Sequence, residues 1–385
     1  MTDLIDICGI AELPQGKTDW PSPMAYHETL VRNALADAQL KLSDVDALFT
    51  VEPRSDAYLV HAIALAERLR ITPEFCWSYT SGGCVPITML QAAHALIESG
   101  RAETAVIIAA DLPLTSVSRD KYVANLAQVG PIHPEFEAPY GPPVPAMFSL
   151  VASAYLDATG QDDRALMQVA LHDRAMAERH PNAHLRKPMS PDDYLASRAI
   201  ATPLRLLDCA PVSNGGGAVV LSRRKKSGGV PIRLRGVGAS TSQMHLSAAA
   251  SLTEFSAGDS LKRALDQAGM KIADLDLFTI YDCFTIAMLV NAEDMGIAPR
   301  GQLAAAFADG RCGPGGTTPI NPHGGLLSHG HPARAGGMGN LIETIVQLRG
   351  EAGARQVPDC AIGMAHGMAG VFASHATGIL ARGDA

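Results

Sequence analysis

The chain has 385 residues, 47% of them hydrophobic and 18% charged, which is the composition of a folded globular protein long enough for two or three domain-sized units. That composition excludes the fibrous and disordered classes. A formal net charge of −8 argues against general nucleic-acid binding. The N-terminus carries acidic residues where a secretory signal needs basic ones, and no apolar run reaches the ~18 residues of a membrane span. We therefore expect a cytoplasmic protein.

The seven cysteines stand singly, with no Cys-x-x-Cys pair and no Cys/His pair at the spacing of a zinc site. They are Cys8, Cys76, Cys84, Cys209, Cys283, Cys312 and Cys360. Isolated cysteines in a cytoplasmic protein are expected to be reduced thiols. The sequence therefore predicts no metal site, and only a few of these thiols can take part in chemistry.

Strand-like apolar runs alternate with segments of helical periodicity, which predicts an α/β protein. Strands are expected, in chain order, at 4–11, 46–52, 104–111, 218–222, 231–239, 276–282, 360–366 and 371–381. Helices are expected at 25–40, 57–69, 86–99, 144–158, 164–178, 259–270, 284–296 and 335–349. The proline-rich stretch 112–145 predicts a long loop region, and the charged, Ser/Gly-containing run 222–229 predicts a linker.

An internal repeat relates two distant parts of the chain. Residues 34–52 and 264–282 share, in order, Ala-Leu, a later Ala, Lys before an apolar residue, Asp-apolar-Asp and Leu-Phe-Thr, with a single one-residue gap. Each copy reads as helix, short turn and strand, and a further helix and strand follow each copy at comparable distances. The chain is therefore predicted to contain two related α/β halves, one on each side of the linker.

Three segments resemble motifs of the thiolases. "NPHGGLLSHGHPARAGG" at 321–337 resembles the Asn-Pro-x-Gly-Gly and Gly-His-Pro signature of that family. "YDCFT" at 281–285 resembles the His-Asp-Cys-Phe box of the sterol-carrier-protein type of thiolase. "DCAPVSNGGGAVVLS" at 208–222 is similar to the segment that closes the first half in that family. With the duplication, the resemblance covers nearly the whole chain.

The resemblance implies the thiolase fold, in which two βαβαβαββ halves stack as five layers. Residues 1–222 would form the N-terminal half, with a loop domain inserted at about 112–210, and residues 230–385 the C-terminal half. The resemblance also implies a homodimer or tetramer that acts on a coenzyme A thioester in lipid metabolism, with no bound cofactor.

Making or breaking a carbon–carbon bond beside a thioester needs a nucleophile for the acyl group, a base for a proton on carbon and donors for the enolate oxygen. By the resemblance, His331 would activate the nucleophile or donate to the thioester oxygen, with Gly330 shaping the loop beside the substrate. Cys283 would be the acid/base that moves the proton on carbon. His323 and His329 match nothing in the family signature and are expected to be loop residues.

Tyr281 stands where related enzymes carry His or Asn, a group that holds a water molecule or the enolate oxygen. A phenol can donate the same hydrogen bond and, with an ordinary pKa of about 10, can also serve as an acid or base of another kind. His366 lies nearest the position of a Cys-x-Gly loop in biosynthetic thiolases. We expect it to line the substrate pocket.

Two neighbouring residues compete for the position of the nucleophile. A thiol at a helix N-terminus, as predicted for Cys84, feels backbone N–H groups that favour the reactive thiolate. Counting back from the helix end at 98–100, however, puts Gly83 at the family's nucleophile position and Cys84 one residue late. A one-residue gap would restore Cys84, so both assignments stay open.

Three functions from different classes follow. The first is a thiolase-type acyl-CoA C-acyltransferase that uses Cys84, Cys283 and His331, which we favour because a thiol stands at a glycine-flanked helix start. The second is a retro-aldol lyase on β-hydroxyacyl-CoA that uses Tyr281, acting with a small partner that carries a zinc ribbon and an OB-fold. The third is a non-catalytic acyl-CoA or lipid-binding protein.

Overall fold

The structure, a computed structural model, describes residues 4–56, 58–116, 132–224 and 229–383. It has the alternating α/β character that the sequence predicts. Part of the predicted loop region (117–131) and part of the predicted linker (225–228) lie outside the described residues.

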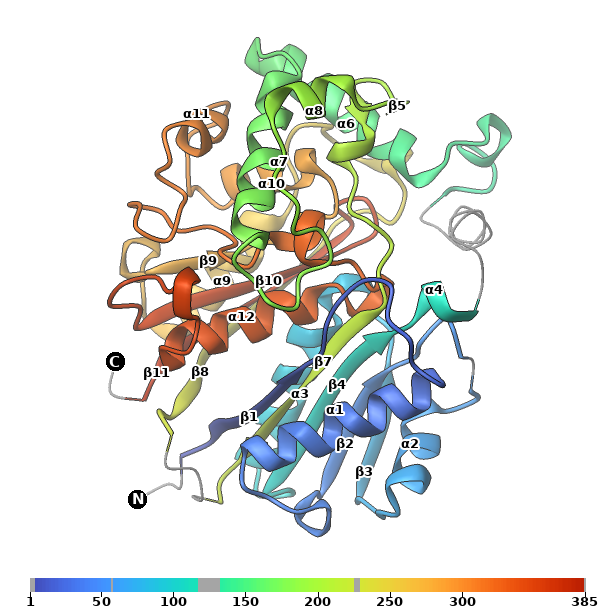
Figure 1. Cartoon of the computed structure of the whole chain (residues 1–385), viewed down its shortest axis with the longest axis vertical. Coiled ribbons are helices and arrows are strands. Elements are labelled where there is room, and N and C mark those ends of the chain that lie inside the picture. The colour runs from blue at the N-terminus through green and yellow to red at the C-terminus, as the bar shows by residue number, and fades with distance from the viewer. Residues whose placement is uncertain (1–3, 57, 117–131, 225–228, 384–385) are drawn as a thin grey trace.

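Among the described residues, nine strands form one sheet, in the order β3-β2-β4-β7-β1-β8-β11-β10-β9 (Figure 1). They are β1 (Asp6–Glu12), β2 (Ala47–Val51), β3 (Phe75–Tyr79), β4 (Thr104–Asp111), β7 (Gly215–Ser222), β8 (Ile232–Thr241), β9 (Leu277–Thr279), β10 (Ile362–Ala369) and β11 (Ser374–Arg382). All eight expected strands are present. Strand β3 was not predicted, because this half-exposed edge strand shows neither an apolar run nor a clean alternation.

The sheet order repeats between the two parts of the chain. The run β2-β4-β7-β1 of the first part matches β9-β10-β11-β8 of the second, with β2–β4 and β9–β10 parallel and the other pairs antiparallel. The two runs join where Ile7 of β1 pairs with Ile232 of β8. Strands β2 and β9, which end the two copies of the sequence repeat, therefore occupy equivalent places.

Two pairs of aspartates explain why the repeat keeps its Asp-apolar-Asp pattern. Asp44 and Asp274 each accept a hydrogen bond from the backbone three residues earlier, at 2.8 and 2.7 Å, and so close the turn before the strand. Asp46 and Asp276 each accept two backbone N–H groups from the start of the neighbouring parallel strand or the residues just before it. The carboxylates thus satisfy backbone donors at strand ends that the ladder leaves unpaired.

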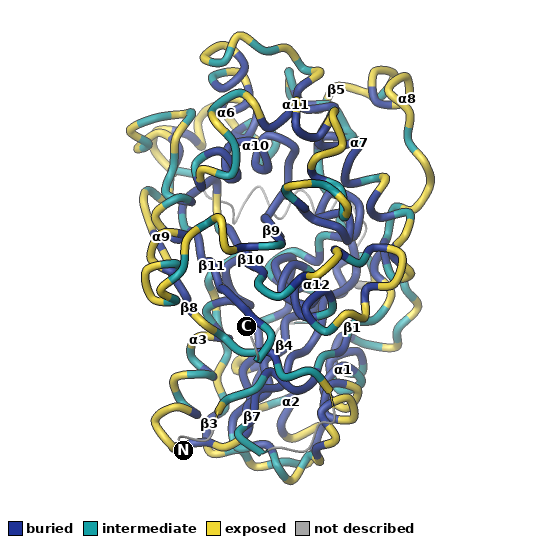
Figure 2. The backbone as a smooth tube through the Cα atoms, turned by 90° about the vertical axis from the view of Figure 1, so that its left-hand side faces the viewer, coloured by how far each residue is buried: buried dark blue, intermediate teal, exposed yellow. Residues whose placement is uncertain are grey.

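Buried apolar side chains form three main cores between the helices and the sheet. The central core joins both parts of the sheet through α3 (Val85–Glu98) and α12 (Gly337–Arg349). A second core packs α1 (Pro23–Asp37) and α2 (His61–Leu69) on the outer face of the first part. A third packs α9 (Ala257–Ala268) and α10 (Thr285–Asp294), among other elements, on the outer face of the second. The burial pattern follows these layers, with buried backbone inside and exposed backbone on the outer helices and loops (Figure 2).

The remaining helices lie above the second part of the sheet and in the connections (Figure 1). They are α4 (Pro113–Ser116), α6 (Val144–Thr159), α7 (Arg164–Ala177), α8 (Pro191–Ala196) and α11 (Leu303–Ala308), with a separate β5 (Ala199–Ala201) and β6 (Leu204–Arg205) ladder. Helices α4, α8 and α11 were not predicted, because four to six residues are too few to show a helical period. Within the described part of the chain, no helix is long and apolar enough to cross a membrane.

Candidate active site

Tyr281 and His331 lie at the centre of the candidate site. The Tyr281 hydroxyl and Nε2 of His331 are 3.1 Å apart, within hydrogen-bond distance. Tyr281 follows the end of β9 by two residues, and His331 follows a π-helical turn at Gly325–His329. The structure therefore brings together two of the residues that the sequence singled out, from segments that are far apart in the chain.

The backbone of His331 is held from both sides by Ser213. The amide of His331 donates to Oγ of Ser213 at 3.1 Å, and the amide of Ser213 donates to the carbonyl of His331 at 3.2 Å. Gly330 has a φ of 151°, and a Cβ there would lie 3.0 Å from Cβ of Gln15. Glycine thus allows both the turn and the close packing that present the imidazole to Tyr281.

Burial lowers the pKa of His331 to about 4. The imidazole is consequently neutral at physiological pH and can accept or donate one proton at Nε2. Part of the residue remains accessible to solvent.

The backbone of Tyr281 is fixed by two buried side chains. Its amide donates to Nδ1 of His366 at 3.3 Å, and its carbonyl accepts from Nδ2 of Asn291 at 3.1 Å. The second ring nitrogen of His366 lies 3.2 Å from Nδ1 of His375. Burial lowers the pKa of both histidines, to about 4 for His375. His366 is fully buried, and its ring nitrogens face Tyr281 and His375.

Gly83 packs directly against the ring of Tyr281. A Cβ at position 83 would lie 2.3 Å from Cε2 of Tyr281 and 2.5 Å from the carbonyl oxygen of Met368. The carbonyl of Gly83 is itself enclosed, since a Cβ at Gly337 or Gly367 would come within 2.4 Å of it. No residue with a side chain fits at position 83 while Tyr281 keeps this place.

The side chain of Cys84 points into the central core. Its thiol lies 3.3 Å from the carbonyl oxygen of Gly367 and 3.4 Å from that of Ser374, and it packs in the central core with α3 and α12. Only 1% of the residue is exposed, and burial raises the pKa of the thiol to about 12. The thiol is therefore protonated at physiological pH, which is unfavourable to the nucleophilic role that the sequence suggests.

Cys283 lies in the same apolar core as Tyr281, behind the carboxyl end of β9. Burial, followed by the charge of Asp282, raises the pKa of its thiol well above the ordinary value. The carbonyl of Cys283 accepts a hydrogen bond from Ala210 at 3.0 Å, which holds the segment against residues 209–210. A protonated thiol at this position is suited to giving a proton rather than taking one.

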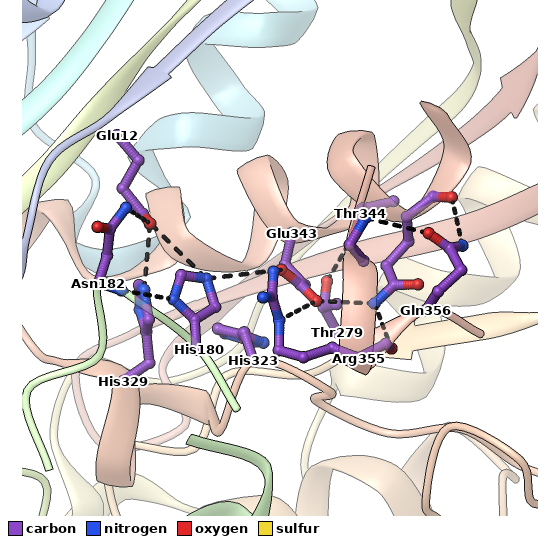
Figure 3. A network of polar contacts seen from close by, with 12 residues as sticks. Glu12, His180, Asn182, Thr279, His323, His329, Glu343, Thr344, Arg355 and Gln356 are labelled. Atoms are coloured by element: carbon purple, nitrogen blue, oxygen red, sulfur yellow. Dashed lines mark hydrogen bonds and ion pairs between the residues drawn. The ribbon is translucent and has the colours of Figure 1, made fainter. Parts of the chain in front are cut away.

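A buried polar network joins Glu12, at the end of β1, to His329 and His180 and continues to Glu343 and Arg355 (Figure 3). Glu12, His180 and His329 offer atoms within 4.8 Å of one another, a group that could hold a metal ion. Nε2 of His329 lies 3.1 Å from Glu12, and Nε2 of His180 lies 3.7 Å from it. The backbone amide of Asn182, however, donates to Nδ1 of His180 at 3.1 Å. The ring proton of neutral His180 is then on Nε2, the atom that faces Glu12, and a protonated nitrogen cannot bind a metal.

The same network holds Glu12 in its ionised form. Burial alone would raise the pKa of Glu12, but the charge and hydrogen bonding of His329, with His180 and Asn182, lower it to about 2. His329 is 3% and His323 1% exposed. The expectation that these two histidines are loop residues is therefore incomplete, because both are buried, His329 against Glu12 and His323 against Asn340.

Comparison with known proteins places the chain in a family. Residues 238–382 match the family described as "Thiolase C-terminal domain-like". The chain is 30% identical over 362 residues to a 17-hydroxy-3-oxo-4-pregnene-20-carboxyl-CoA lyase of Mycobacterium tuberculosis, an alignment that covers 89% of this chain and 91% of that protein. The chain therefore belongs to the thiolase superfamily.

Other relatives match over less of their length. An acetyl-CoA acetyltransferase of Methanothermobacter thermautotrophicus is 31% identical over 252 residues, which cover 64% of this chain and 66% of that protein. Rabbit sterol carrier protein 2 is 28% identical over 236 residues, 59% of this chain and 43% of that protein. The chain thus spans only part of these two relatives.

Solved structures confirm the expected thiolase fold. The structure of the "Ltp2-ChsH2(DUF35) aldolase" has a TM-score of 0.85 and 26% identity and covers 99% of this chain and 98% of that one. A monomeric SCP2-thiolase-like protein type 1 from Mycobacterium smegmatis has a TM-score of 0.74 at 17% identity, with 99% and 77% coverage. The second likeness concerns the fold alone.

Proposed function

We propose that this thiolase-superfamily protein is a retro-aldol lyase that cleaves the Cα–Cβ bond of a β-hydroxyacyl-CoA thioester. The single observation that carries the proposal is the place of Tyr281. Its ring fills the space that any side chain at position 83 would need, and its hydroxyl lies 3.1 Å from Nε2 of His331. With Gly83 assigned to the family's nucleophile position, a phenol paired with a neutral imidazole replaces the acyl-transferring thiol.

The pair can carry the proton transfer that starts cleavage. The hydroxyl of Tyr281 takes the proton of the substrate's β-hydroxyl while it passes its own proton to Nε2 of His331. The electrons of the substrate's β O–H bond form the new carbonyl. The Cα–Cβ bond then breaks, and its electron pair moves into the thioester as an enolate. Imidazolium is unfavourable at a site that lowers the pKa of His331 to about 4, but the enolate forms together with it and has the opposite charge.

The enolate carbon must then take a proton to give the shortened acyl-CoA. We assign this step to Cys283, whose thiol keeps its proton until the enolate forms because burial raises its pKa. The proton held by His331 then returns to the Cys283 thiolate, so both groups regain their starting states. We assign His366 a supporting role instead of the substrate contact that the sequence suggested, since both its ring nitrogens face protein groups.

Acyl transfer remains the second candidate, favoured by the 31% identity to an acetyl-CoA acetyltransferase. That reaction needs a thiolate that reaches the substrate. The Cys84 thiol is buried beside two carbonyl oxygens and is protonated. Cys84 would have to move and lose its proton before it could accept an acyl group, which is why we place the lyase first.

We further propose a small partner protein with a zinc ribbon and an OB-fold. The resemblance to thiolase-like lyases motivates this, and the structural neighbour at a TM-score of 0.85 is an aldolase whose name pairs Ltp2 with ChsH2(DUF35). The substrate would be a coenzyme A thioester, and the proposed reaction needs no other cofactor. We place the reaction in the cytoplasm.

Self-association is proposed through strand β3, which forms one end of the described sheet. Trp77 on this strand is 46% exposed, and Leu59 and Ile63 near it are 98% and 55% exposed. An edge strand with apolar side chains around it can pair with the same strand of a second copy. This supports the homodimer, the smallest assembly that the sequence suggested.

The test is a product assay. The purified protein, alone and with a small protein that carries a zinc ribbon and an OB-fold, is incubated with β-hydroxyacyl-CoA esters, and the products are followed by mass spectrometry. A ketone or aldehyde together with a shortened acyl-CoA supports the lyase. Condensation of two acyl-CoA molecules to a β-ketoacyl-CoA and free CoA, with no cleavage of any β-hydroxyacyl-CoA, would overturn it.

A further inference from the structure

The carboxylate of Asp282 contacts the loop that carries His331. Its two oxygens accept the amides of Leu326 and Leu327, at 2.7 and 3.2 Å. These residues belong to the π-helical turn Gly325–His329, which ends two residues before His331. A Cβ at Gly325 would lie 2.1 Å from Oδ2 of Asp282, so the turn closes tightly over the carboxylate.

The backbone of Asp282 is joined directly to Tyr281. One residue therefore connects the two members of the candidate pair: its main chain carries Tyr281, and its side chain holds the turn that leads to His331. Short π-helical turns of this kind are rare and often occur at functional sites. In the sequence, Asp282 stands out only as a member of the "YDCFT" motif, and no role for it follows from the motif alone.

Asp173 of α7 stands against this carboxylate from the other side. Asp173 and Asp282 are both fully buried. Burial, and then the charge and hydrogen bonding of Asp282, raise the pKa of Asp173, and burial also raises the pKa of Asp282. Two adjacent buried carboxyl groups cannot both be ionised, so the pair keeps one proton. Asp282 receives the two amide donors, which stabilise a carboxylate, so the proton belongs on Asp173.

We propose that Asp282 is a positioning residue, which sets the distance between Tyr281 and His331 by tying the π-helical turn to the end of β9, with Asp173 supporting its carboxylate from α7. The inference rests on the proposed function, because the pair is taken as the site of proton transfer. A displacement of about 1 Å at such a site can cost about 100-fold in rate.

The experiment compares Asp282→Asn with Asp276→Asn. Asp276 is a matched control, because it also accepts two backbone amides, both at 2.9 Å, but at the other end of β9 and far from His331. We expect Asp282→Asn to lower kcat by about 100-fold while KM changes by less than about threefold. It should also shift the His331 signal in spectra of ¹³C-histidine-labelled protein, assigned by its loss in His331→Gln. Asp276→Asn should lower the Tm and leave kcat and that signal as in the wild type.

A second pair of variants covers the case in which Asp282→Asn does not fold. Asp173→Asn keeps a neutral donor against Asp282 and should retain kcat and the His331 signal, whereas Asp173→Ala removes the support and should change both. An unchanged His331 signal in Asp173→Ala, or equal effects of Asp282→Asn and Asp276→Asn, would overturn the inference. If the wild type cleaves no β-hydroxyacyl-CoA, the proposed function fails, and the His331 signal still decides the positioning role.

Discussion

The ring of Tyr281 occupies the space that a side chain at position 83 would need, since a Cβ there would lie 2.3 Å from Cε2 of the tyrosine. The two residues come from different halves of the fold: Gly83 lies in the turn just before α3, and Tyr281 follows the end of β9. Tyr281 can lie beside His331 in this way only because position 83 carries no side chain.

We expect Gly83→Ala to lower both the Tm and the rate of cleavage, because the added methyl displaces the Tyr281 ring. An overpacked buried site of this kind typically costs about 1–3 kcal/mol of the free energy of unfolding. The double variant Gly83→Ala/Tyr281→Ala should recover part of the lost Tm but no activity. Additive losses of Tm in the double variant, measured by thermal unfolding, would contradict the contact.

Tyr281→Phe removes one hydroxyl with little change in packing. If this hydroxyl takes the substrate proton, kcat for β-hydroxyacyl-CoA cleavage should fall by about 10²- to 10⁴-fold while the Tm stays near that of the wild type. Tyr155→Phe is the matched control, since its buried hydroxyl donates to Glu293 at 2.9 Å, near the end of α10 that is farther from Tyr281 in the chain. Cleavage that survives in Tyr281→Phe would remove the tyrosine from the mechanism.

Cys84 separates the lyase from the acyltransferase. We expect Cys84→Ala to keep most of its cleavage activity and to lose about 1 kcal/mol of stability from the central core. Wild-type protein incubated with acyl-CoA alone should gain no acyl mass on the peptide that contains Cys84. An acyl adduct there, absent from Cys84→Ser, would instead establish acyl transfer.

The pH profile should report the burial of His331. Its pKa is lowered to about 4, so kcat/KM should lose activity on the acid side near pH 4 and show no loss near the ordinary histidine value of about 6.5. Brief exposure to each pH separates this from unfolding. A loss centred near pH 6.5 would mean that His331 is solvated in the active protein.

Histidine burial should also make the fold sensitive to acid. The pKa values of His61 and His180 are lowered to about 3, and those of His172 and His375 to about 4. For a lowered pKa, the stabilisation is present above the unfolded value of about 6.5 and is lost as the pH falls toward the folded value. The Tm should therefore decline progressively between about pH 6.5 and pH 3.

The buried carboxyl of Asp173 should make the stability of the fold depend on pH in the opposite direction. A carboxyl whose folded pKa is raised contributes stability that is complete below its unfolded value and is lost as pH rises toward the folded value. Relative to the wild type, Asp173→Asn should gain stability as the pH increases, at about 1.4 kcal/mol per pH unit above about pH 4. Denaturant unfolding of both proteins at several pH values measures the difference, and a constant difference would show that the Asp173–Asp282 pair holds no shared proton.

The local features of this fold were predictable from the sequence. Apolar runs and helical periods located eight strands of the sheet and the longer helices, because those signals depend on residues within one or two turns of each other. The repeat predicted the equivalence of β2 and β9, which the sheet order confirms. Edge strand β3 and the shortest helices escaped because half-exposed or very short elements carry little periodic signal.

The candidate residues were also recognisable from the sequence, since Tyr281, Cys283 and His331 stand in motifs that resemble those of thiolases. What each residue faces was decided only by the tertiary structure. Successive residues at a helix start point about 100° apart, so a one-residue uncertainty in counting separates a side chain in the site from one in the core. The burial that keeps Cys84 and Cys283 protonated and His331 neutral, and the link from Asp282 to the His331 loop, arise from contacts between segments distant in sequence. No local pattern encodes such contacts, because they exist only once both halves of the sheet have packed around α3 and α12.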